Sequence, residues 1–260
     1  MSEPVAPMTV ADVESPRIGN GDVDWDQFDS RAYFDHNYGT LRDDDAQVID
    51  IVANFFQDAA PAWAERAIDV GTGANLYPAL TMLPFAAEVV LYERAFSNRQ
   101  WLTDELRDPH RSWWRFWDHI AGGSRGHGAY AALREPFDLL SRRAEVVKGN
   151  VFSLPPGQFD LGTMFFVAES ITTRDDEFER ATQSFVNSLK ARAPFAAVFI
   201  RNSSGYEVSG RSFPACSVDE RHVRRALAPV AQGTRIRPVT SADHRDGYHA
   251  MIVATGRKRA

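Results

Sequence analysis

A strand, a glycine turn, a helix and a second strand follow one another between residues 66 and 98, and this unit constrains the fold more than any other stretch. Residues 67–70 form a short apolar run that stops at Gly71-Thr72-Gly73, which indicates a buried strand followed by a tight turn. Residues 75–85 are expected to form a helix and residues 89–92 a second buried strand. Such a βαβ unit predicts a parallel sheet, and parallel sheets bind ligands at the edge where their strands end.

Two classes of ligand use a glycine turn of this kind. Dinucleotide enzymes have Gly-x-Gly-x-x-Gly, because the pyrophosphate rests on the helix N-terminus, but the third position here is Leu76. S-adenosylmethionine carries no phosphate and needs only a low turn and an acid for its ribose hydroxyls. Asp69-x-Gly71-x-Gly73, with Thr72 inside the turn and Glu93 at the end of the second strand, fits that ligand. We therefore predict an S-adenosylmethionine site, with an NAD-dependent oxidoreductase as the alternative.

The composition is that of a globular protein, because 44% of the residues are hydrophobic and 25% are charged. With 260 residues the chain can bury one full core, so one domain with a tail is the simplest organisation. The net charge of −6 gives no uniform positive face for nucleic acid, and no apolar stretch reaches the roughly 20 residues of a membrane span. The single cysteine, Cys216, excludes an intrachain disulfide, so we expect a cytoplasmic protein.

Strands and helices are predicted to alternate over most of the chain. Further strands are expected at residues 145–148, 159–167, 195–201, 235–239 and 248–255. Helices are expected at residues 43–58, 98–106, 129–143, 175–191 and 218–228. Together with the first unit, these segments predict a doubly wound, mostly parallel α/β sheet of seven strands. Whether residues 107–128 form part of the pocket stays open, although the aromatic side chains at 113–117 are expected to form a separate hydrophobic cluster.

The N-terminal region is expected to have two parts. Residues 1–24 mix Pro, Ser, Asp and Gly without periodicity, so we predict a disordered tail that is not a signal peptide. Residues 25–260 then form the single domain. Its first part, residues 25–60, starts with an aromatic segment and is expected to supply helices and a lid over the site.

The motifs along residues 28–257 resemble those of the nicotinamide, phenylethanolamine and thioether methyltransferase family. The resemblance rests on Phe28-Asp-Ser-Arg-Ala-Tyr33-Phe-Asp-His-Asn-Tyr38, Ile68-Asp-Val-Gly-Thr-Gly-Ala-Asn-Leu-Tyr77, Glu93 with Asn98, Lys148-Gly-Asn-Val151, Ala168-Glu169, and Gly205-Tyr206-x-x-x-Gly210. It implies a Rossmann-like fold with an N-terminal helical lid, S-adenosylmethionine as cofactor, and methyl transfer to a small molecule.

The resemblance also implies how the cofactor is held. Gly71 and Gly73 would let the backbone approach its methionine part, and Glu93 would accept hydrogen bonds from both ribose hydroxyls. The other expected cofactor contacts are Tyr33, Tyr38, Asp69, Thr72, Tyr77, Asn98, Asn150 and Val151. Core packing of the three tyrosines, and ordinary capping or turn roles for the two asparagines, stay open as alternatives.

An amine is the expected methyl acceptor, because Glu169 follows the strand at 159–167 where amine-methylating relatives place an acid. Glu169 is therefore the first candidate catalytic residue, and Asp243 and His244, before the last strand, form the second candidate position. The expected substrate contacts are Tyr33, Glu169, Asn202, Ser204, Tyr206, Asp243 and His244. Oxygen, sulfur and carbon acceptors stay open, as do a capping role for Glu169 and a plain charged turn at 243–244.

Two departures from the family pattern bear on the site. Asn150 stands where the family has an aspartate, and the loop at 201–204 lacks an acid that often follows that strand. The histidines do not have metal-binding spacing, so no metal is predicted. The sequence is compatible with a monomer or a homodimer. Besides the oxidoreductase, a non-catalytic binding module on the same fold is the competing hypothesis.

Overall fold

The parallel pair of β1 (Ala64–Val70) and β2 (Ala86–Glu93) is the base of the sheet, and α3 (Tyr77–Met82) lies in the connection between them. In their register Val70 lies beside Tyr92, so the glycine turn and Glu93 reach the same edge. This computed structural model describes residues 17–61, 63–123, 128–245 and 248–260, with the backbone alone at 241–245 and 248–249.

Five further strands complete a seven-stranded sheet in the order β3-β2-β1-β4-β5-β9-β8. Their bounds are β3 (Ala144–Lys148), β4 (Leu161–Phe165), β5 (Pro194–Ile200), β8 (Ala231–Arg245) and β9 (Tyr248–Lys258). The first five strands in this order are parallel, whereas β9 runs antiparallel to both β5 and β8. Every residue of β5 is buried, as expected for a strand with helices over both faces. The predicted doubly wound sheet is confirmed.

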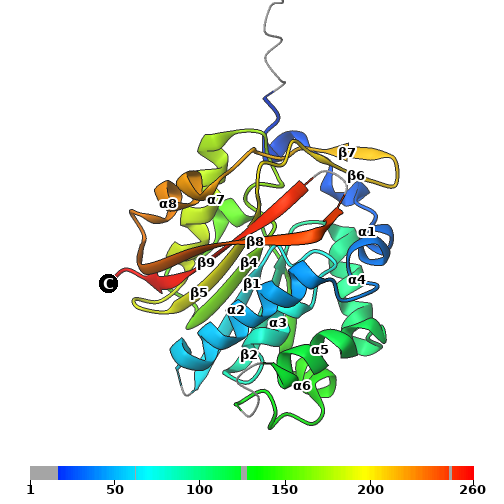
Figure 1. Cartoon of the computed structure of the whole chain (residues 1–260), viewed down its shortest axis with the longest axis vertical. Coiled ribbons are helices and arrows are strands. Elements are labelled where there is room, and N and C mark those ends of the chain that lie inside the picture. The colour runs from blue at the N-terminus through cyan, green and yellow to red at the C-terminus, as the bar shows by residue number, and fades with distance from the viewer. Residues whose placement is uncertain (1–16, 62, 124–127, 246–247) are drawn as a thin grey trace, which may run out of the picture.

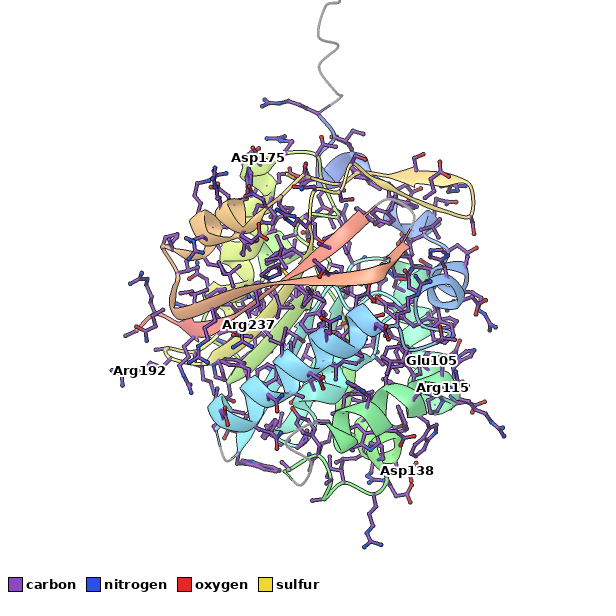
Figure 2. The ribbon with its side chains drawn as sticks, viewed as in Figure 1. Glu105, Arg115, Asp138, Asp175, Arg192 and Arg237 are labelled. Carbon is purple, nitrogen blue, oxygen red and sulfur yellow. The ribbon has the colours of Figure 1, made fainter. Side chains whose placement is uncertain are left out.

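Helices cover both faces of the sheet (Figure 1). On one face lie α2 (Asp43–Ala59), α3, α5 (Ser112–Gly122) and α6 (Pro136–Arg143), and on the other lie α7 (Asp175–Ser188) and α8 (Glu220–Leu227). The side chains of each strand alternate between these layers: Ala67 and Leu91 join the first core, and Ile68 and Val90 join the second. Charged side chains such as Arg115, Asp138 and Arg192 project from the outer surface (Figure 2).

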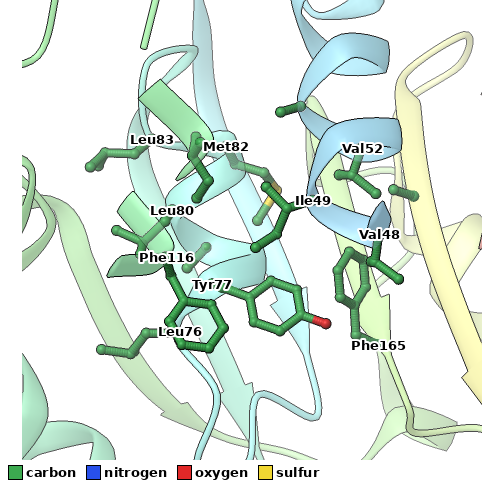
Figure 3. Close-up of a cluster of buried hydrophobic side chains, with 14 of the residues drawn as sticks. Val48, Ile49, Val52, Leu76, Tyr77, Leu80, Met82, Leu83, Phe116 and Phe165 are labelled. Atoms are coloured by element: carbon green, nitrogen blue, oxygen red, sulfur yellow. The ribbon is translucent and has the colours of Figure 1, made fainter. Parts of the chain in front are cut away.

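α2 belongs to the core, although it lies within the N-terminal region. Its side chains Val48, Ile49, Val52 and Phe56 are completely buried, and the first three pack beside α3 (Figure 3). Within the expected lid region, it is therefore α1 (Ser30–Asn37) and the short turn η2 (Trp25–Gln27) that lie near the carboxyl edge of the sheet. None of the helices among the described residues is long and apolar enough to cross a bilayer.

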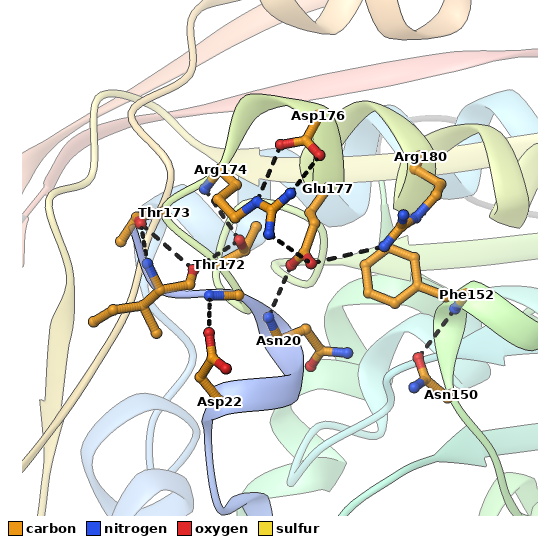
Figure 4. A network of polar contacts seen from close by, with 12 residues as sticks. Asn20, Asp22, Asn150, Phe152, Thr172, Thr173, Arg174, Asp176, Glu177 and Arg180 are labelled. Carbon is orange, nitrogen blue, oxygen red and sulfur yellow. Dashed lines mark hydrogen bonds and ion pairs between the residues drawn. The ribbon is translucent and has the colours of Figure 1, made fainter. Parts of the chain in front are cut away.

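Residues 17–24 are fixed to the domain, so the expectation of a tail through residue 24 is wrong for them. The Ile18 amide donates to Thr173 Oγ1 over 2.8 Å, and the Asn20 amide donates to Glu177 Oε2 over 2.8 Å (Figure 4). A short 3₁₀ turn, η1 (Asn20–Asp22), follows, and Asn20 is buried. Residues 1–16 lie outside the described part of the chain.

Three local expectations are corrected by the packing. The helix expected at 129–143 starts only at Pro136, a residue suited to a helix start because it has no N–H to leave unpaired. The aromatic run forms α5, whose Trp113 and Phe116 belong to the main core and not to a separate cluster. A small hairpin, β6 (Tyr206–Val208) with β7 (Arg211–Phe213), was not expected, and it pairs apart from the main sheet.

Candidate active site

A cavity of about 800 Å³, its solvent-open part included, lies over the carboxyl ends of the parallel strands. The turns after β1, β2, β3 and β4 contribute to its wall, together with the segment before α1, α1 itself and β6. The lining residues are Asn20, Trp25, Phe28, Tyr33, Tyr38, Gly71–Asn75, Tyr92–Arg94, Asn98, Gly149–Val151, Phe165–Val167, Ser170, Ile171 and Tyr206. This is the edge at which the sequence predicted a ligand site.

The turn after β1 is held in a conformation that favours glycine. Gly71 and Gly73 have φ angles of 65° and 61°, in the left-handed region. A Cβ atom on Gly71 would lie 2.7 Å from Cγ2 of Val167, so this position has no room for a side chain. A Cβ on Gly73 would come no nearer than 3.7 Å to its closest neighbour, the Gly71 carbonyl oxygen. The turn is therefore low, and the cavity can reach its backbone.

Glu93 lies buried between two backbone amides at the end of β2. Its Oε2 accepts from the Gly73 amide over 2.8 Å, and its Oε1 accepts from the Ala95 amide over 2.7 Å. Burial raises the pKa of Glu93, while these amides and the Asn98 side chain favour its charged form. Because the carboxylate also lines the cavity, it can accept hydrogen bonds from a ligand diol.

Asn98 links Glu93 to the first turn of α1. The Ser30 hydroxyl donates to Asn98 Oδ1 over 2.7 Å, and the Asn98 side chain hydrogen-bonds Glu93. Both Ser30 and Asn98 are buried, so water does not compete for this contact. The buried acid and the first turn of α1 thus belong to one polar network.

The end of β3 forms the far wall of the cavity. The Asn150 side chain accepts from the Phe152 amide over 3.1 Å and so caps the short turn η3 (Val151–Ser153) (Figure 4). Asn150 and Val151 both line the cavity, and their contact with the cofactor stays a prediction. The turn role that stayed open for Asn150 is present as well, because the Asn150 Oδ1 atom serves the cap.

Aromatic rings surround the opposite part of the cavity. Tyr33 lies between Tyr38 and Tyr206, with ring centroids 6.0 and 6.4 Å apart, and Phe28 packs on Tyr33 at 5.1 Å. Behind them Phe213 of β7 stacks on Tyr206 at 5.4 Å. The N-terminal segment, α1 and the β6–β7 hairpin thus meet in one aromatic cluster beside the cavity.

Three predicted site residues lie behind the cavity wall. Asp69 sits beneath the glycine turn, where Oδ1 accepts from the Thr163 hydroxyl over 2.7 Å and burial raises the Asp69 pKa to about 7. Tyr77 is fully buried, and its ring stacks on Phe116 at 5.6 Å (Figure 3). The Tyr77 hydroxyl contacts Asp45 Oδ1 at 3.3 Å. Glu169 is also fully buried, next to the cavity residue Ser170.

Glu169 has an unusual environment for a carboxyl group. Its Oε1 accepts from the Ile200 amide over 2.8 Å and from the Ser170 hydroxyl over 3.3 Å. Its Oε2 is buried without a hydrogen-bond partner among the described residues. Burial raises the pKa of Glu169 to about 7, so this group changes its charge near neutral pH.

Some of the other predicted substrate residues line the cavity and some do not. Tyr33 and Tyr206 line the cavity, whereas Asn202 and Ser204 are exposed in the loop after β5 and do not line it. Asp243 and His244 lie at the end of β8, where the side chains are outside the described residues.

Sequence reasoning missed several residues of the cavity wall, among them Asn20, Trp25, Tyr92, Arg94, Ser170 and Ile171. Tyr92, Arg94 and Ser170 each adjoin a predicted acid, so a strand-end position was the available signal for them. The Asn20 carbonyl at the cavity accepts from the Arg94 guanidinium over 2.9 Å. The two residues lie far apart in the sequence, so a local sequence pattern does not predict this contact. Among the described residues, no three His, Cys, Asp or Glu side chains are grouped as a metal site.

Comparison with known proteins identifies the family of this fold and cavity. A sequence profile of the NNMT/PNMT/TEMT family matches residues 20–255. No protein of curated function matches the chain by sequence.

Solved structures are similar over most of the chain. The N-methyltransferase NodS from Bradyrhizobium japonicum WM9, solved with S-adenosyl-L-homocysteine, aligns over 90% of this chain and 95% of its own, at 8% identity and a TM-score of 0.51. A S-adenosylmethionine-dependent methyltransferase from Clostridium acetobutylicum ATCC 824 aligns over 88% and 97%, at 11% identity and a TM-score of 0.52. One from Methanosarcina mazei aligns over 79% and 96%, at 13% identity and a TM-score of 0.52. At such identities these likenesses show the fold alone.

The profile match, in contrast, extends from Asn20 in the cavity wall to Thr255 in the last strand. The chain therefore belongs to the NNMT/PNMT/TEMT family, whose members are S-adenosylmethionine-dependent methyltransferases.

Proposed function

We propose that this methyltransferase transfers the methyl group of S-adenosylmethionine to the nitrogen of a small-molecule amine. The observation that carries the donor part is the order of the strand ends beneath the cavity: β3, β2, β1 and then β4. The residues there are Asn150 and Val151, then Glu93, then the glycine turn, and then Phe165–Val167. In that order the strand ends suit the donor's adenine, then its ribose, then the sulfonium with its methionine chain, and Phe165–Val167 would face the methyl group that the sulfonium carries.

The chain's residues then divide between the two reactants. Glu93 and Asn98 would bind the ribose hydroxyls, and the turn at 71–73 would hold the methionine part with its backbone. When bound, the cofactor supplies an electrophilic methyl group on a sulfonium, which needs an aligned nucleophile more than a strong acid or base. Orientation of this kind can contribute on the order of 7 to 11 kcal/mol in ideal cases.

The side of the cavity proposed for the methyl acceptor is expected to bind an amine, because aromatic rings line it and Glu169 lies close behind it. Tyr33, Phe165 and Tyr206 line that side, and aromatic faces attract the positive charge that a methylated amine carries. Ser170 lines the cavity and its hydroxyl donates to Glu169 Oε1, so this hydroxyl would offer a proton from the amine a path to that carboxyl group. With its pKa near 7, Glu169 can take up that proton at neutral pH.

The other expected roles remain part of this proposal. α1, with Tyr33 and with Tyr38 at its C-terminal cap, is proposed as a lid that keeps water from the sulfonium, because both tyrosines line the cavity. Asp243 and His244 are proposed as substrate contacts on the family resemblance. For Asn202 and Ser204 a contact would require the loop after β5 to move, because both lie outside the cavity wall.

Transfer of a radiolabelled methyl group from S-adenosylmethionine tests the proposal. Primary and secondary amines would be compared with thioethers and phenols, using the wild type, Glu93→Gln, and Glu88→Gln as a control at the other end of β2, where Glu88 pairs with Arg66. We expect labelled amine product with the wild type and the control, and a large loss with Glu93→Gln. Label found only in thioether or phenol products would contradict the amine assignment, and equal activity of Glu93→Gln would contradict the donor site.

A further inference from the structure

The ring of Tyr92 occupies the space that a side chain at position 149 would fill. A Cβ atom on Gly149 would lie 1.8 Å from Cζ of Tyr92 and 2.2 Å from both Cε2 and Oη. No real Cβ approaches an atom so closely, so the two positions are coupled: the ring can lie there only while residue 149 is glycine. The backbone N–H of Asn150 hydrogen-bonds the Tyr92 hydroxyl and helps to fix the ring.

The glycine is required by this contact and not by its backbone. Gly149 is not among the residues with positive φ, so an alanine would fit the local conformation. The three nearest atoms to its virtual Cβ all belong to Tyr92. Removal of the Tyr92 ring should therefore allow a side chain at 149, which makes the pair suitable for a double-variant test.

Tyr92 forms a flat apolar wall at one end of the cavity. It lines the cavity together with Val151 and Ile171, and Tyr92 and Ile171 pack against the hydrophobic cluster that contains Val151. The next residue, Glu93, is the buried acid of the donor site. Tyr92 is only half-buried, so part of its side chain remains accessible.

The order of the strands says which ligand group meets this wall. Gly149 follows β3, which lies beyond β2 on the side away from the glycine turn of β1. With the ribose at Glu93 and the methionine part at the turn, the group that extends toward β3 is the adenine. From this geometry we infer that Tyr92, held in place by the absence of a side chain at Gly149, is the aromatic platform for the adenine base of the cofactor.

This inference rests on the donor placement proposed above and adds two residues to it. A planar base gains from contact with a planar ring, and the loss of one aromatic–base stacking contact typically weakens binding about tenfold or more. In Gly149→Ala the new methyl group would force the Tyr92 ring out of its place and into the cavity, where it would obstruct the base. The two substitutions thus damage the same contact from opposite sides.

Isothermal titration with two ligands tests the assignment by binding alone. S-adenosylhomocysteine contains adenine, ribose and the amino-acid part, whereas 5′-methylthioadenosine lacks the amino-acid part. We expect Tyr92→Ala and Gly149→Ala each to weaken both ligands by about tenfold, and the double variant to bind no worse than Tyr92→Ala. Tyr92→Phe, which keeps the ring, should stay within about twofold of the wild type.

Controls separate this inference from folding and from the donor site itself. Gly122→Ala, where no atom lies within 4 Å of the virtual Cβ, should bind like the wild type, and the melting temperature of each ligand-free variant reports folding. If the wild type binds S-adenosylhomocysteine but Gly149→Ala binds it equally well, the Tyr92–Gly149 platform is overturned while the donor site stands. The same holds if the double variant loses the product of the two single losses, or if 5′-methylthioadenosine is unaffected. A wild type that binds neither ligand would overturn the donor site as well.

Discussion

The backbone amide of Gly73 donates a 2.8 Å hydrogen bond to Oε2 of Glu93, so the turn after β1 is joined directly to the acid at the end of β2. A ligand diol at Glu93 must therefore share a carboxylate that already holds the turn in shape. On the proposed donor placement, the same side chain would hold the turn in shape and bind the ribose of the donor.

Replacement of Glu93 by alanine should weaken the binding of the methyl donor. Glu93→Ala removes the acceptor for the ribose hydroxyls, and we expect the affinity for S-adenosylmethionine to fall by roughly 1.5 to 3 kcal/mol, the scale for hydrogen bonds to a charged group. Isothermal titration calorimetry measures the dissociation constant directly. Glu88→Gln, on the same strand, serves as the control, and an unchanged dissociation constant for Glu93→Ala would refute the assignment.

The two glycines of the turn should respond differently to alanine. At both positions the left-handed backbone costs an alanine about 1 to 2 kcal/mol. At Gly71 the new methyl group would in addition press on Val167 at 2.7 Å, and overpacking of this kind costs about 1 to 3 kcal/mol more. Urea unfolding should therefore show Gly71→Ala to be clearly less stable than Gly73→Ala, and equal stabilities would contradict the packing argument.

Loss of the Ser30 hydroxyl should be felt at the donor site, although Ser30 belongs to α1. Ser30→Ala leaves Asn98 Oδ1 without the Ser30 hydrogen bond, so Asn98 is held less firmly against Glu93. We expect the affinity for S-adenosylhomocysteine to fall by about 0.5 to 1.5 kcal/mol. Ser209→Ala, which removes only an exposed contact with Asp29, should change nothing in the same titration. If both variants behave alike, the Ser30–Asn98–Glu93 link has no role in binding.

The stability of the protein should fall as the pH rises toward neutral. Burial raises the pKa of Glu169 from 4.5 to about 7, so between these pH values the folded chain holds a proton that the unfolded chain has lost. This contribution is complete below about pH 4.5 and is lost as the pH rises through about 7, with a limit of about 3 kcal/mol. Asp69, whose pKa burial also raises to about 7, acts in the same direction.

The variant Glu169→Gln isolates the contribution of Glu169 to the pH dependence of stability. The amide keeps an acceptor for the Ile200 and Ser170 hydrogen bonds but cannot ionise. Free energies of unfolding in urea, measured from pH 5 to pH 8, should decline less for Glu169→Gln than for the wild type. The exposed Glu207→Gln should keep the wild-type slope. Identical slopes for Glu169→Gln and the wild type would mean that Glu169 does not titrate in this range.

The local part of the proposed donor site could be predicted from the sequence. The turn at 71–73 and Glu93 lie at the ends of two adjacent strands, and the apolar runs of both strands can be recognised in the sequence. Parallel pairing brings such strand ends together. All seven strands of the sheet could be predicted from their apolar residues. What the alternation of elements left open was the strand order, which decides that β3 and β4 flank the pair on opposite sides.

The predictions that were wrong concern residues whose contacts are with residues distant in the chain. Residues 17–24 look like a tail until Thr173 and Glu177, more than 150 positions away, accept their amides. Tyr77 was expected at the cofactor because it follows the glycine turn, but the packing of α3 against Phe116 turns its ring into the core. Local pattern could place these residues along the chain but could not say which way their side chains face.

The separate pairing of the β6–β7 hairpin has a consequence for how members of one family diverge. Within the described residues the hairpin pairs with no strand of the seven-stranded sheet, and its Tyr206 lines the side of the cavity proposed for the methyl acceptor. An exchange of residues 203–215 between relatives would thus alter which molecule is accepted without disturbing the machinery that holds the nucleoside. The proposed assignment therefore makes the hairpin an exchangeable unit of substrate choice.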